Sequence, residues 1–176
     1  LQQLKDKGFR QHYLTLHVSA GAFRPIKEQD IRQHPMHSEQ VLVSRQNVES
    51  LMVCKGKVIA VGTTSLRTLE SLYWYGVMLK QHPEAAFMVP KLIAYETAAE
   101  NILTLRESME TILAHMDRQN VDQLMGETEI FIFPGYTFRV IEGLITNFHM
   151  PKSTLVLLIA ALVGEDWRQI YDHALQ

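Results

Sequence analysis

The sequence lacks the features of a secreted or membrane protein. Its one cysteine, Cys54, excludes a disulfide within the chain. The longest strictly apolar run covers residues 155–163, far short of the roughly 20 residues that span a bilayer. No charged-then-apolar leader opens the chain. We therefore expect a cytoplasmic protein that does not enter a membrane.

The chain also lacks an excess of either charge, because its formal net charge is only -2. Residues 1–72 carry ten Lys/Arg against six Asp/Glu, whereas residues 73–129 carry four against nine. Nucleic-acid binding usually needs a positive face, so charge alone neither supports nor excludes RNA. With 176 residues, 47% of them hydrophobic, the chain is long enough for one domain with a real core.

Three segments share a pattern in which a β-rich run is followed by a polar loop. The runs are residues 13–18, 57–61 and 143–146, and their loops are residues 19–22, 62–65 and 147–153. A helical pattern follows the second loop, over residues 66–74, and another follows the third loop. This repetition predicts an α/β fold with a mostly parallel sheet flanked by helices, in which ligands bind beyond the carboxyl ends of the strands.

The remaining middle of the chain predicts a helical insertion at about residues 77–127 within a domain that covers residues 1–176. Its clearest element is a helix over about residues 95–116, with an apolar stripe that indicates packing: Ile102, Leu105, Met109, Ile112 and Met116. Residues 129–133 predict a strand, and the turn at residues 134–136 with a second short strand to Val140 predicts a hairpin.

The first candidate site follows the second β-run, where Gly62 is followed by Thr63, Thr64 and Ser65 at the start of a helix. Backbone N–H groups and hydroxyls in that place favour an anion, with Arg67 one turn into the helix. The alternative is that Thr64 or Ser65 only caps the helix. No G-K-[ST] ending is present, so the pattern gives no support to nucleotide triphosphate hydrolysis.

The second candidate is the segment of residues 34–39, which holds His34, His37 and Glu39. Three interpretations stay open: a metal site, a solvated surface loop, and a catalytic pair. Pro35 favours extended backbone at His34, which argues against helical chelation. In an extended segment His37 and Glu39 share one side, where the carboxylate can tune the imidazole for acid–base work.

The third candidate follows the third β-run and combines Asn147, His149, Lys152 and Ser153 at a strand-to-helix junction. These residues supply hydrogen-bonding groups and a cation, while Ser153 or Thr154 can cap the next helix. A structural role and a binding role are both consistent with this pattern. His17 lies in a β-run and suits a structural histidine, although the small residues after it would let a planar ligand approach the backbone.

Five elements resemble, in order, those of the S-adenosylmethionine:tRNA ribosyltransferase-isomerase family of queuosine biosynthesis. They are L-H-V-S-A-G-A-F-R-P at residues 16–25, H-P-M-H-S-E at 34–39, V-G-T-T-S-L-R-T-L-E-S at 61–71, I-F-I-F-P-G-Y-T-F at 130–138 and L-I-T-N-F-H-M-P-K-S-T at 144–154. The chain is similar to the C-terminal part of the α/β catalytic domain of this family. The family's N-terminal half, with its inserted β-barrel, is expected to lie outside the chain.

The resemblance implies transfer of the ribosyl group of S-adenosylmethionine to an aminomethyl-deazaguanine base at the tRNA wobble position. The ribosyl group is isomerised to give epoxyqueuosine, with release of adenine and methionine. S-adenosylmethionine is then a co-substrate and tRNA a partner, and no metal or other cofactor is expected. We expect His37 with Glu39, or His149, to move protons. The groups expected to bind substrate are His17, Thr63, Thr64, Ser65, Arg67, Asn147, Lys152 and Ser153.

Several departures from the family pattern keep other functions open. Ser19 and Ala22 replace the usual Gly and Thr, Glu142 stands where Asp is common, and the acidic stretch over residues 77–127 is long. A divergent paralogue that binds S-adenosylmethionine or RNA without catalysis is one alternative, and a metal-dependent hydrolase is another. The sequence leaves open the oligomeric state, the identity of the base, and whether this chain is active alone.

Overall fold

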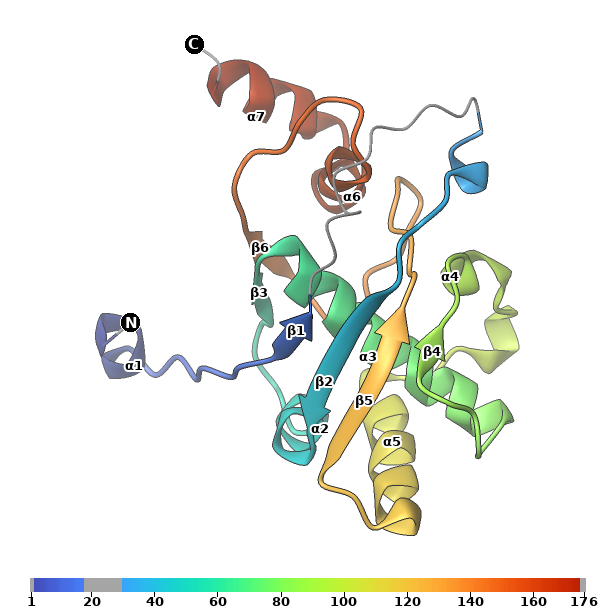
Figure 1. The fold of residues 1–176 in the computed structure, drawn as a ribbon. Coiled ribbons are helices and arrows are strands. Elements are labelled where there is room, and N and C mark those ends of the chain that lie inside the picture. Colours follow the sequence, from blue (N-terminus) through green and yellow to red (C-terminus); the bar gives the residue numbers. More distant parts are fainter. Residues whose placement is uncertain (1, 18–29, 175–176) are drawn as a thin grey trace.

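A computed structural model describes residues 2–17 and 30–174. In it, a four-stranded sheet of order β1-β2-β5-β4 stands beside a two-stranded sheet, β3-β6 (Figure 1). The elements are α1 (Gln2–Asp6), β1 (Thr15–His17), η2 (Ile31–Gln33), β2 (Glu39–Ser44), α2 (Arg45–Met52), β3 (Ile59–Val61), α3 (Thr63–Gln81), β4 (Met88–Val89), α4 (Ile93–Glu96), η3 (Ala99–Asn101), α5 (Leu105–Gln119), β5 (Gln123–Thr128), β6 (Gly143–Ile145), α6 (Thr154–Val163), η4 (Gly164–Asp166) and α7 (Trp167–Ala174).

The predicted α/β architecture with flanking helices is confirmed, but the direction of the strands is mixed. β3 pairs with β6 in parallel, as expected, and β4 pairs with β5 in parallel, a pairing that the sequence did not predict. β1 and β5 run antiparallel to β2, which corrects the prediction of a mostly parallel sheet. Along β2 buried and more exposed residues alternate, and Val41 and Val43 point into the core. Such alternation is typical of antiparallel strands with one face toward solvent.

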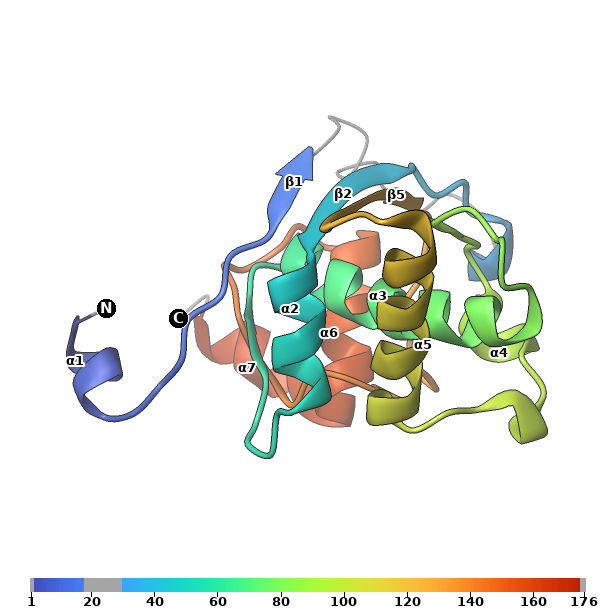
Figure 2. The same ribbon diagram turned by 90° about the horizontal axis from the view of Figure 1, so that it is seen from below.

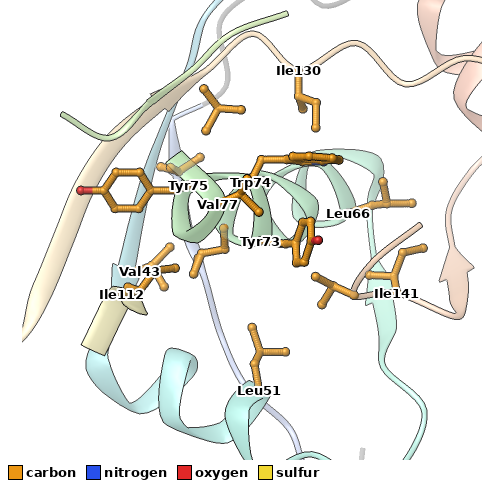
Figure 3. Close-up of a cluster of buried hydrophobic side chains, with 14 of the residues drawn as sticks. Val43, Leu51, Leu66, Tyr73, Trp74, Tyr75, Val77, Ile112, Ile130 and Ile141 are labelled. Atoms are coloured by element: carbon orange, nitrogen blue, oxygen red, sulfur yellow. The ribbon is translucent and has the colours of Figure 1, made fainter. Parts of the chain in front are cut away.

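Helices α2, α3 and α5 cover one face of the four-stranded sheet (Figure 2). The core centres on α3, whose consecutive Tyr73, Trp74 and Tyr75 are all about 1% exposed. Figure 3 shows these three rings pointing in different directions from the helix. The ring of Tyr75 stacks on Phe87, with ring centroids 4.3 Å apart. A helix that is apolar around most of its circumference is a central one.

Helices α3 and α5 cross closely at Gly76. A Cβ atom at Gly76 would collide with the side chain and backbone of Ser108 on α5. The Ser108 hydroxyl donates a 2.8 Å hydrogen bond to the carbonyl of Tyr73. The glycine is therefore required by the approach of the two helices rather than by its backbone angles.

The middle of the chain differs from its prediction in three ways. The helix expected over residues 95–116 is α5, Leu105–Gln119, because Thr104 and Glu107 form a capping box that starts the helix there. The segment of residues 77–127 also contributes β4 and most of β5 to the sheet, so it is helical only in part. Helix α3 begins earlier and ends later than the expected residues 66–74.

The hairpin predicted around residues 134–136 is wrong, because β5 ends at Thr128 and residues 129–142 form no strand. Residues 129–133 are still held to a neighbouring segment, since the N–H groups of Glu129 and Phe131 donate to the carbonyls of Val89 and Lys91. A turn does follow, with Gly135 at a φ of 101°. None of the helices in the described ranges is both long and apolar enough to cross a membrane.

Candidate functional site

The loops that follow β3 and β6 meet at one edge. The two strands pair in parallel, with Val61 opposite Ile145, and the N–H of Gly62 donates a 2.8 Å hydrogen bond to the carbonyl of Ile145. The predicted anion segment at residues 62–65 and the polar loop at residues 146–153 are therefore neighbours. Both loops lie at the carboxyl ends of parallel strands, where the βα pattern predicts that ligands bind.

Among the described residues, no side chain caps the start of α3. Its N-cap is Gly62, with a φ of 91°, and Thr63, Thr64 and Ser65 are the first three helical residues. The alternative that Thr64 or Ser65 caps the helix is therefore wrong. N–H groups in a first helical turn have no partner within the helix. All three side chains are half-buried, so their hydroxyls remain within reach of a ligand.

Arg67 lies deeper than an exposed anion-binding residue would. It is 5% exposed, its Nη1 lies 2.6 Å from Oε1 of Glu39, and its Nε donates to the carbonyl of Ile130. Burial lowers the pKa of Arg67, and the carboxylate of Glu39 partly offsets that effect. The Glu39–Arg67 ion pair therefore joins the segment of residues 34–39 to the start of α3.

This ion pair is incomplete. In the described part of the chain, Oε2 of Glu39 and Nη2 of Arg67 are buried and have no hydrogen-bond partner. Glu39 is 2% exposed. Buried polar atoms are nearly always paired in folded proteins, so two unpaired atoms on one ion pair indicate a place where another molecule or water belongs.

A cavity of about 20 Å³ lies beside the ion pair, which is room for one water. Its polar lining includes His34 and His37, and Thr154 and Leu155 at the start of α6 close another side. The loop that carries the histidines is held by Lys91, whose Nζ donates to the carbonyl of His34. A nucleoside-sized molecule would therefore have to bind next to this cavity rather than inside it.

His37 and Glu39 share the lining of the cavity but do not bond to each other. Within residues 2–17 and 30–174, Nε2 of His37 is buried without a partner, and the ion-pair partner of Glu39 is Arg67. The expected support of His37 by Glu39 is thus replaced by the Glu39–Arg67 pair. No group of three or more His, Cys, Asp or Glu side chains in the same ranges is arranged to hold a metal ion.

His149 lies half-buried in the loop before α6. Its backbone N–H donates to Tyr171, and its Nε2 lies 3.4 Å from Oγ1 of Thr146. Nδ1 is buried and has no partner among the described residues. Burial lowers the pKa of His149 from its ordinary 6.5, so the neutral imidazole is favoured near neutral pH.

The other residues of this loop divide between structure and surface. Ser153 caps α6, because its Oγ accepts a 3.3 Å hydrogen bond from the N–H of Val156, which confirms one of the two caps expected there. Asn147 and Lys152 are exposed, and Lys152 has a φ of 60°. His17 is exposed at the end of β1, opposite Gln40. The small-residue loop after it, residues 19–22, lies outside the described residues.

Sequence reasoning missed a second buried carboxylate, Glu70, which is fully buried on α3. It accepts hydrogen bonds from the hydroxyl of Tyr136 and from three consecutive backbone N–H groups, those of Arg139, Val140 and Ile141. Burial raises the pKa of Glu70, while these hydrogen bonds lower it in part. The available signal was the position of Glu70, one turn after Arg67 and just before the largely apolar run of residues 72–79 in the same helix.

Comparison with known proteins identifies the family of the chain. The family model described as "Queuosine biosynthesis protein" matches residues 1–176. The chain belongs to the queuosine biosynthesis protein family. A relative in this family, S-adenosylmethionine:tRNA ribosyltransferase-isomerase of Polynucleobacter asymbioticus, is 36% identical over 179 residues, which is 99% of this chain and 38% of that protein.

A solved member of the family has a similar fold. The S-adenosylmethionine tRNA ribosyltransferase of Thermotoga maritima matches with a TM-score of 0.55 and 25% identity over 98% of this chain and 41% of the other. The chain thus spans about two-fifths of the length of the relatives it matches. The family resemblance expected from the five motifs is confirmed.

Proposed function

We propose that the protein transfers the ribosyl group of S-adenosylmethionine to the aminomethyl-deazaguanine base at the wobble position of a tRNA and isomerises it to epoxyqueuosine. Adenine and methionine leave. The observation that carries the proposal is the incomplete Glu39–Arg67 pair beside His37, at an edge shared with the loop of His149. Family membership over residues 1–176 supports it.

The reaction needs a base that removes a proton beside the sulfonium and an acid that assists the departure of adenine. His149 suits the base, because its lowered pKa keeps the imidazole neutral and Nδ1 has no partner in the described chain. His37 is the other candidate for proton transfer, since its Nε2 also has no hydrogen-bond partner in the described chain. Each imidazole thus has one buried nitrogen without a hydrogen-bond partner among the described residues.

Positioning of the substrates would fall to the two neighbouring loops. The first turn of α3, Thr63 to Ser65, offers N–H groups and hydroxyls to an anion such as the carboxylate of the methionine moiety. Lys152 and Asn147 are exposed at the same edge and suit contacts with tRNA. Arg67 is best placed to hold Glu39 and to offer its amino group Nη2 toward the cavity.

The test is release of adenine by the full-length protein incubated with S-adenosylmethionine and tRNA carrying the precursor base. We expect adenine, measured by liquid chromatography, in amounts equal to the modified tRNA. A control reaction omits the tRNA. Folded protein that binds S-adenosylmethionine but releases no adenine above background would instead favour the binding-only paralogue.

A further inference from the structure

A second cavity lies away from the candidate site, at the opposite ends of the same two strands. Its volume is about 310 Å³, and its lining includes Val58, just before β3, and Glu142, just before β6. Because each strand has three residues, the two sites are separated by roughly 10 Å of strand at about 3.3 Å per residue. At about 30 Å³ per water, this cavity has room for a group the size of a phosphate.

The cavity contains an arginine that is held in place yet has no anionic partner. The guanidinium of Arg139 lies 5.8 Å from the ring centre of Tyr73 and 6.0 Å from that of Trp74, so two aromatic faces orient it. Its Nε is buried without a hydrogen-bond partner, and no carboxylate within the described ranges forms an ion pair with it. The donors of a guanidinium form a planar fork that matches phosphate oxygens.

The neighbouring charges leave the cavity positive. Lys55 lies in its lining with an exposed side chain, and Glu142 supplies one opposing charge. Glu70 lies nearby but outside the lining, and within the described ranges it forms no ion pair with the guanidinium of Arg139; its carboxylate accepts the backbone N–H of Arg139 and three other hydrogen bonds. The lining itself therefore carries two cations and one carboxylate, a net charge of one positive unit.

We propose that this cavity binds a backbone phosphate of the RNA whose base enters the candidate site. The proposal rests on the proposed function for the identity of the RNA. Arg139 makes the main contact, Lys55 adds a second positive charge, and Glu142 weakens the attraction. The separation of roughly 10 Å, three residues of strand, allows one RNA strand to reach both places.

The test measures binding of an in vitro transcribed tRNA to the full-length protein without S-adenosylmethionine, at several salt concentrations. We expect Arg139→Gln to weaken binding about tenfold and Lys55→Gln about two- to fivefold. Each should reduce the slope of log affinity against log salt by about 0.7–0.9. Glu142→Gln should tighten binding, which a variant that merely damages the fold would not do.

The matched control is Arg118→Gln, which removes one positive charge at the far end of α5, where Arg118 donates to the carbonyl of Pro83. We expect its affinity and salt slope to equal those of the unaltered protein. Unchanged binding in Lys55→Gln and Glu142→Gln overturns the proposal, even if Arg139→Gln fails to fold. The binding measurement needs no turnover, so it can be made even if the protein releases no adenine. Unchanged tRNA binding in the variants would likewise not contradict the proposed reaction.

Discussion

Helix α3 carries one buried carboxylate, Glu70, and contacts a second, Glu39, through Arg67, and the surroundings of the two differ. Glu70 accepts four hydrogen bonds, from one hydroxyl and three backbone N–H groups. Glu39 is just as buried but has an ion pair at one oxygen and, among the described residues, no partner at the other. Full satisfaction makes a polar network rigid and specific, whereas an unpaired buried atom is costly. We therefore assign Glu70 to the fold and propose Glu39 for the site.

The network of Glu70 extends further than its own bonds. Nε1 of Trp74 donates a 2.8 Å hydrogen bond to the hydroxyl of Tyr136, which in turn donates to Glu70. This chain ties the segment of residues 136–141 to the middle of α3. The same segment leads into β6, and thus the satisfied carboxylate positions the strand that ends at the candidate site.

The largest expected effect is on stability and comes from Glu70→Ala. The substitution leaves three backbone N–H groups and one hydroxyl buried without an acceptor, so we expect a loss of about 4 kcal/mol in the free energy of unfolding. Urea denaturation of the full-length protein measures it. Glu110→Ala, on the exposed side of α5, should change stability by less than about 0.5 kcal/mol. A loss below about 1 kcal/mol for Glu70→Ala would remove the structural role.

The next largest effect is also on stability and tests whether Glu39 and Arg67 are energetically coupled. Arg67→Met alone leaves a buried carboxylate without its cation, and we expect it to cost about 3 kcal/mol. The double variant Arg67→Met with Glu39→Leu should cost less than Arg67→Met alone, because no charge is then left unpaired. Unfolding by urea gives both values. A double variant that costs as much as Arg67→Met or more would mean that the pair is not coupled as the geometry shows.

The smallest expected effect concerns the pH dependence of His149. Its pKa is lowered below 6.5 by burial, so the folded state binds a proton less readily than the unfolded state. The stability gained from the neutral imidazole is therefore present above pH 6.5 and is lost as pH falls through the lower folded pKa. NMR titration should give a midpoint below 6.5, with His149→Gln to assign the resonance. A midpoint at or above 6.5 contradicts the burial effect.

The sequence predicted the junctions of the site better than the strands of the sheet. The loops after residues 61 and 146 were expected beyond the carboxyl ends of the strands because β-run, polar loop and helix pattern recur in order, and β3 and β6 do pair in parallel. The direction of β2 was not predicted, because strand pairing depends on contacts distant in sequence. Glu39 meets Arg67, 28 positions later, for the same reason.

Local patterns misled where they competed with tertiary contacts. The run Glu129–Phe133 has strong β propensity, yet it forms no strand because β5 already ends at Thr128, whose hydroxyl accepts the N–H of Ile130. The helix expected from residue 95 begins only at Leu105, where Thr104 and Glu107 supply a capping box. That box was visible in the sequence as T-x-x-E and outweighs the apolar spacing before it.

Turnover of His37→Gln and His149→Gln tests the central claim most directly. The claim is that His37 and His149 transfer protons, and each imidazole has one buried nitrogen without a hydrogen-bond partner in the described chain. Adenine release by full-length variants, normalised to folded protein, measures the effect. We predict that each variant loses at least about tenfold in turnover, as for a proton-transfer group. Unaltered turnover in both variants would contradict the assignment.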